Sequence, residues 1–148
     1  MKNNIVSANK NNYKFIFSNI MLMNILFFYY IFLVAIFILS GIDKIWNLKS
    51  NSLNLSEKIK LNLPTPLFIC VIVIVIIIEI GCSFIILYST LTYKYKRACY
   101  YSAVVLIGFT IMATLLYHFP PNKGNYYNFL KNLSIIGGLF LIVNGTKF

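Results

Sequence analysis

The chain has 148 residues, of which 59% are hydrophobic and 11% are charged. Its mean hydropathy is +0.79. Soluble domains are about half apolar and about a quarter charged, so this composition argues against a soluble enzyme. Because a helical membrane crossing needs about 20 mostly apolar residues, the composition predicts an all-α integral membrane protein, a bundle of four spanning helices.

A polar N-terminal arm is predicted over residues 1–18, which are rich in Asn and Lys, and we expect it to be loosely structured. The remaining residues, 19–148, form one predicted membrane domain. Its first span covers about 20–42, which is longer than the apolar core of a signal peptide. No small-residue cleavage pattern follows this segment, so we expect it to remain as a membrane helix.

Three further spans are predicted at about 66–91, 100–118 and 128–143. The second span is rich in β-branched residues, which in water would indicate a buried strand. In lipid, however, an isolated strand leaves its backbone groups unpaired, so we expect a helix. Between the first two spans lies a polar loop, in which Ser56–Leu61 is predicted to form a short surface helix capped by Ser56.

The formal net charge is +10. The cations lie between the apolar runs rather than on one face, which favours contacts with lipid headgroups over nucleic acid. Four spans place both termini on the same side of the membrane. The turn after the second span, Tyr93-Lys94-Tyr95-Lys96-Arg97, contains cations and no acid, so the positive-inside rule predicts that this side and both termini are cytoplasmic.

Glu79 is the most informative residue, because it lies near the middle of the second span among isoleucines. A carboxylate at such a position costs about 2.5 to 3.5 kcal/mol on insertion scales. One interpretation is a catalytic or ligand-orienting acid that faces the bundle interior and handles protons. The other is a protonated side chain that donates a hydrogen bond to a neighbouring helix and fixes the packing.

Lys131, early in the fourth span, is the second candidate catalytic residue, because its long side chain could approach Glu79 from the same membrane face. The alternative is that Lys131 points outward to the lipid headgroups. Asp43 and Lys44, at the end of the first span, are expected to form an interfacial charge pair. His118, which ends the third span, is expected to be an interfacial side chain rather than a ligand.

The sequence offers no recognisable set of metal ligands. Its single histidine and three cysteines match neither a bis-histidine haem nor the spacing of a zinc or iron–sulfur site. Cys70 and Cys82 lie twelve residues apart on one predicted helix, about 18 Å along its axis, so they cannot form a disulfide with each other. Any part in electron transfer would therefore need a diffusible quinone or a partner subunit.

Several segments resemble the DoxX-like family of small four-helix membrane proteins. They are Leu39–Ile45 at the end of the first span, the prolines before the second span, Glu79 followed by Gly81, and Phe129–Leu139 in the fourth span. The resemblance covers about Leu26 to Val143, although the loop from Lys49 to Lys60 is longer than expected. It implies the four-helix scaffold, and some members of the family are called oxidoreductases or thiosulfate:quinone oxidoreductase subunits.

Two functions are compatible with these observations. The first is a DoxX-like, quinone-linked or accessory oxidoreductase subunit, in which Glu79 exchanges a proton and Lys131 offers a positive charge to a carbonyl or anion. The second is a non-enzymatic membrane scaffold or cargo-binding protein that uses the polar loop and the basic turn. The expected partners are the lipid bilayer and a partner oxidoreductase or other membrane protein, and quinone is the candidate cofactor.

Overall fold

The computed structural model describes residue 25 and residues 27–59 and 64–146. The regular elements of this part of the chain are helices. The first helix is Phe27–Trp46, and it is followed by α2 (Leu48–Ile59), α3 (Thr65–Thr92), α4 (Lys96–His118) and α5 (Tyr126–Gly145). The first helix, α3, α4 and α5 are each long and apolar enough to cross a membrane. The predicted all-α, multi-pass membrane fold is therefore confirmed.

The helices extend beyond the predicted spans at several ends. The first helix continues to Trp46 instead of ending near residue 42, and α4 begins at Lys96 instead of near residue 100. Lysine and arginine are good helix formers, and their long side chains can reach water from the end of a span, so charge does not mark a helix boundary. The predicted arm at 1–18 and the predicted start of the first span lie outside the described residues.

The short helix between the first two spans differs from its prediction. It begins at Leu48, eight residues before the expected start at Ser56. The Ser56 hydroxyl donates to the carbonyl of Leu53 at 2.7 Å, so Ser56 is an interior residue and not an N-cap. Leu55 is buried on the inner side of α2 and packs against Phe68 and Ile72 of α3. These tertiary contacts explain why a segment with many polar residues is helical.

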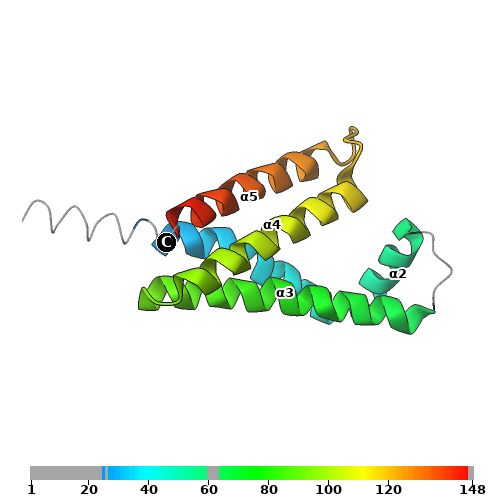
Figure 1. Cartoon of the computed structure of the whole chain (residues 1–148). Coiled ribbons are helices and arrows are strands. Elements are labelled where there is room, and N and C mark those ends of the chain that lie inside the picture. Colours follow the sequence, from blue (N-terminus) through cyan, green and yellow to red (C-terminus); the bar gives the residue numbers. More distant parts are fainter. Residues whose placement is uncertain (1–24, 26, 60–63, 147–148) are drawn as a thin grey trace, which may run out of the picture.

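The long helices run in alternating directions (Figure 1). One end of the bundle contains the turn between α3 and α4, the start of the first helix and the end of α5, because Tyr30, Tyr93 and Gly145 line a common cavity there. We call this the turn end. The opposite end contains α2 and the connection between α4 and α5 (Figure 1), and we call it the α2 end. The compartment that each end faces stays a prediction.

The turn between α3 and α4 is short and closely held. Tyr93 and Tyr95 have left-handed φ angles of 53° and 59°, a conformation that costs a residue other than glycine about 1 to 2 kcal/mol. The Ser89 hydroxyl donates to the carbonyl of Lys94 at 2.6 Å. The ring of Tyr95 stacks on that of Tyr88 with centroids 6.0 Å apart. These contacts fix the reversal of the chain at the turn.

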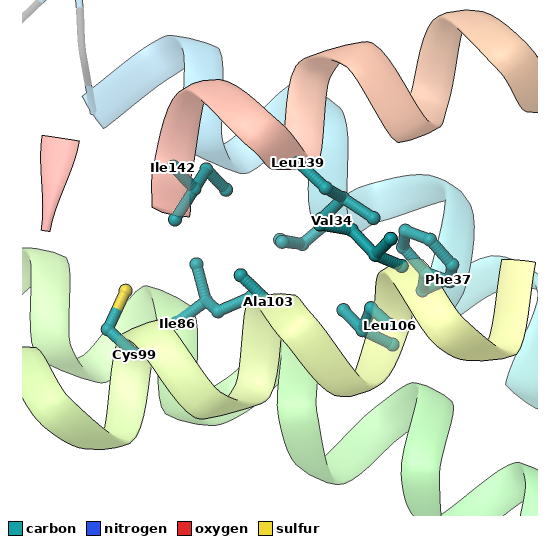
Figure 2. Close-up of a cluster of buried hydrophobic side chains, with 9 residues drawn as sticks. Val34, Phe37, Ile86, Cys99, Ala103, Leu106, Leu139 and Ile142 are labelled. Carbon is teal, nitrogen blue, oxygen red and sulfur yellow. The ribbon is translucent and has the colours of Figure 1, made fainter. Parts of the chain in front are cut away.

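The main apolar core lies between the four long helices. Figure 2 shows its side chains directed toward one another from the first helix, α3, α4 and α5. The core residues drawn and labelled there are Val34, Phe37, Ile86, Cys99, Ala103, Leu106, Leu139 and Ile142. Every labelled residue is almost fully buried. The core therefore holds all four spanning helices together nearer the turn end than the α2 end.

Polar contacts also join α5 to the first helix and to α4. The Tyr29 hydroxyl donates to the carbonyl of Gly138 at 2.6 Å and connects the first helix to α5. The Asn132 amide donates to the Thr114 hydroxyl at 3.0 Å and connects α5 to α4. Interhelical hydrogen bonds of this kind contribute about 0.6 kcal/mol each in membranes, so they orient the helices more than they stabilise the fold.

Candidate functional site

The polar site of the bundle is formed by two helices that are distant in sequence. Ser40 and Lys44 lie four residues apart on the first helix, so they share one face, and Glu79 lies on α3. The Lys44 ammonium donates to both carboxylate oxygens of Glu79 at 3.0 Å, and the Ser40 hydroxyl donates to Oε1 at 3.1 Å. Lys44 also donates to the Ser40 hydroxyl. Lys44 and Glu79 form the one ion pair found among the residues that the structure describes.

The two charges of this pair differ in their exposure. The Glu79 side chain is 2% exposed and the Lys44 side chain is 20% exposed. A buried carboxylate needs a cation and hydrogen-bond donors to offset the loss of hydration, and Lys44 and Ser40 supply both. The pair therefore removes most of the cost that an isolated acid in a membrane span would carry.

A close backbone approach brings the two helices together at the pair. A Cβ atom added to Gly41 would lie 2.6 Å from Cγ1 of Ile80 and 3.7 Å from Cβ of Glu79. Only a residue without a side chain fits at this distance unless Ile80 moves. On α3 itself, the Ser83 hydroxyl donates to the carbonyl of Glu79 at 2.6 Å. Glu79 therefore lies where the two helices approach each other most closely at the pair, with its Cβ atom beside Gly41.

The pair lies closer to the α2 end than the position of Glu79 within α3 suggests. Trp46 is 82% exposed and follows Lys44 by two residues, about 3 Å along the helix axis. Tryptophan concentrates at the membrane–water interface. With 28 residues, α3 is about 42 Å long, whereas the hydrocarbon core is about 30 Å thick. Trp46 therefore indicates that the N-terminal turns of α3, against which α2 packs, extend past that boundary.

The structure does not bring Lys131 to Glu79. Lys131 is exposed on the first turns of α5, and its ammonium lies 3.5 Å from Oδ1 of Asn128. The expected pair of Asp43 and Lys44 is wrong as well, because Asp43 accepts a hydrogen bond from the Asn47 amide at 2.8 Å while Lys44 turns inward. The cation that contacts Glu79 is Lys44 of the first helix and not Lys131 of α5.

His118 lies apart from this pair, at the end of α4. Its Nδ1 atom is buried without a hydrogen-bond partner among the described residues. Lys131 of α5 and Lys58 of α2 are near enough to its ring to repel a positive charge there. Lys131 therefore belongs to a basic group at the α2 end and not to the Glu79 site.

The geometry defines what the Glu79 carboxylate can do. A carboxylate has about four lone-pair positions; Oε1 accepts from Lys44 and Ser40, and Oε2 accepts from Lys44. Contact of one ammonium with both oxygens is typical of an ion pair, not of a carboxylic acid that donates a hydrogen bond. The described residues contain no group of three or more His, Cys, Asp or Glu side chains placed to hold a metal ion.

Part of this site was visible in the sequence. Glu79 was identified from its position, and Ser40, Gly41 and Lys44 all lie in the segment Leu39–Ile45 on which the DoxX-like resemblance rests. The sequence also contains a signal for the partners of Glu79, because the four-residue spacing of Ser40 and Lys44 places a hydroxyl and an ammonium on one helix face. Comparisons of the chain with family models, with curated proteins and with solved structures find no match.

Proposed function

We propose that this chain is a non-enzymatic multi-pass membrane protein that binds another membrane protein, and that the pair of Lys44 and Glu79 maintains the shape of its bundle. The observation that carries the proposal is that donors from the chain itself contact both oxygens of the carboxylate and take three of its about four lone-pair positions. A catalytic acid needs a reacting group within hydrogen-bond reach. At Glu79 that space is taken by the first helix.

The exposed side of α2 is the surface that fits a protein partner. Its inner side is covered by α3, whereas Lys49, Asn54, Glu57 and Lys58 are exposed. A helix that carries both signs of charge can set the register of a complex through complementary charges. This helix also lies in the loop where the chain departs from the DoxX-like resemblance, which supports a contact particular to this chain.

A second candidate function follows from the same pair. The segments that resemble the DoxX-like family supply Ser40, Gly41, Lys44 and Glu79, and the Lys44 side chain is 20% exposed. This opening supports a quinone-linked or accessory role in a membrane oxidoreductase, in which a lipophilic carbonyl competes with Glu79 for the Lys44 ammonium. Lys131, the cation predicted for that role, lies elsewhere.

The test compares what two variants retain after in-cell crosslinking and purification in mild detergent. The double variant Lys44→Met/Glu79→Leu replaces both charges by apolar side chains of similar size, and the variant Lys49→Glu/Lys58→Glu reverses charges on α2. We expect native mass spectrometry to show a stoichiometric partner protein with the wild type and with the first variant, but not with the second. A bound quinone that disappears from the first variant, without any partner protein, would instead establish the redox role.

A further inference from the structure

A cavity of about 160 Å³ lies at the turn end of the bundle. All four long helices line it, with Tyr30 from the first helix, Ser89 from α3, Cys99 from α4 and Gly145 from α5. Its volume is about ten times the ~15 Å³ that admits one water molecule, so a polar group of several heavy atoms fits inside. Ser89 lies ten residues from Glu79, about 15 Å along α3, so the cavity and the ion pair are separate sites.

The hydroxyl groups of the lining divide into two kinds. Ser89, Thr90 and Thr146 donate to backbone carbonyls of their own helix or turn, at 2.6, 2.7 and 2.9 Å. These three hydroxyl groups therefore have no proton left to donate to a ligand. The other polar side chains of the lining, Tyr30, Tyr93 and Lys96, bring two hydroxyl donors and an ammonium. A set of donors that includes a positive charge suits an anionic oxygen ligand.

The distribution of charge supports the same ligand. The chain has three acidic residues. Asp43 and Glu57 lie at the α2 end, and Glu79 is paired with Lys44. The turn end carries Lys94, Lys96 and Arg97 without an acid in the described part of that end. The field around the cavity is therefore positive, and it attracts anions at the membrane surface.

The backbone adds to this field. Lys96 is the first residue of α4, whose N-cap, Tyr95, makes no side-chain capping hydrogen bond. The N-terminus of a helix carries a partial positive charge and amide groups that favour an anion. Tyr88 and Leu91, which precede Ser89 and follow Thr90 in the sequence, are more than half exposed, and they provide apolar and aromatic surface on the last turns of α3.

From these observations we propose that the cavity binds the phosphate group of an anionic phospholipid, held by Lys96, Tyr30 and Tyr93, with the acyl chains lying along the outer surface of the bundle. Inorganic phosphate would offer the same oxygens without the acyl chains. The apolar surface beside the cavity favours the lipid.

The experiment is native mass spectrometry of the full chain, released from bilayers of equal parts phosphatidylglycerol and phosphatidylcholine. We expect the wild type to retain phosphatidylglycerol preferentially. Lys96→Gln is expected to lower that retention about tenfold, because a hydrogen bond to a charged group contributes at least about 1.5 kcal/mol. Tyr93→Phe removes one hydroxyl donor with little change in packing, and it is expected to lower retention in the same direction by a smaller factor.

The matched control is Lys94→Gln, which removes the same charge from the same turn but does not line the cavity. It is expected to change retention less than about twofold, because diffuse surface charge is screened by salt. Equal losses in Lys94→Gln and Lys96→Gln would overturn the proposal, as would equal retention of the two lipids. Displacement of the lipid by inorganic phosphate, or binding of inorganic phosphate alone by lipid-free protein, would identify a free anion as the ligand and also overturn it. Circular dichroism establishes that each variant remains helical.

Discussion

The backbone of Gly41 in the first helix lies directly against Ile80 in α3, the residue that follows Glu79. This approach places Ser40 and Lys44, which flank Gly41 on the same helix, within hydrogen-bond distance of the carboxylate. The close packing of the two helices and the buried ion pair are therefore one structural feature. A change at either part is expected to affect the other.

Replacement of Gly41 by alanine is expected to destabilise the bundle. The new methyl group would lie 2.6 Å from Cγ1 of Ile80, and overpacking of this kind costs about 1 to 3 kcal/mol. Reversible unfolding in mixed detergent micelles measures the loss. Gly81→Ala is the control, because its Cβ would meet nothing within 4 Å. If Ile80→Ala does not reduce the cost of Gly41→Ala, the proposed clash is not its cause.

Adjacent glycines of α5 allow a second matched comparison. A Cβ at Gly138 would lie 2.8 Å from Cδ1 of Leu33 and 3.1 Å from the Tyr29 hydroxyl, whereas one at Gly137 would meet nothing within 4 Å. Gly138→Ala is therefore expected to lower the free energy of unfolding by about 1 kcal/mol. Gly137→Ala is expected to be neutral or to stabilise the helix by about 0.5 kcal/mol or more. Equal effects of the two changes would contradict the close approach of the first helix to α5.

The attachment of α2 depends on Leu55. This residue is 5% exposed, while Leu53 on the same helix is 45% exposed. Leu55→Ala removes the buried contact with Phe68 and Ile72, so we expect amide hydrogen exchange of α2 to become at least about tenfold faster. Leu53→Ala is expected to leave the exchange rates of α2 nearly unchanged. Equal acceleration by both changes would show that α2 is not held through its Leu55 side.

Lys131 and Lys44 are expected to respond differently to loss of charge. Lys131 is exposed and its ammonium lies 3.5 Å from the amide oxygen of Asn128, so Lys131→Gln should change the free energy of unfolding by less than about 0.5 kcal/mol. Lys44→Gln leaves the buried Glu79 carboxylate without its cation and should be markedly destabilising. A large effect of Lys131→Gln would support the pairing with Glu79 that the sequence suggested.

The membrane fold could be predicted because long apolar segments and their breaks are local properties of the sequence. The turn predicted at Tyr93–Arg97, for example, follows from neighbouring residues. The helix α2 was placed too late, because its stability comes from Leu55 packing on α3, a contact that no local pattern records. The ends of the first helix and α4 also differ from the prediction, because both helices extend beyond the apolar residues of the predicted span.

The candidate site could be predicted only in part. An acid in an apolar span is conspicuous, so Glu79 was found, but its partner depends on how two helices are rotated about their axes. That rotation is set by Gly41 and Ile80. Distance along the helices alone indicates Lys131 as the partner of Glu79, and the sequence pairs Lys44 with Asp43 instead. The cavity at the turn end was missed because its lining comes from all four long helices.

The central claim is that Lys44 and Glu79 form one buried pair that joins the first helix to α3. A double-mutant cycle with Lys44→Met, Glu79→Leu and the double variant, followed by unfolding in mixed micelles, tests it most directly. Breaking a buried pair costs about 3 kcal/mol or more, whereas replacing both charges by apolar side chains is often nearly neutral. We therefore expect each single change to be destabilising and the double variant to recover at least about 2 kcal/mol of the summed loss. Single effects that are small and simply additive would contradict the claim.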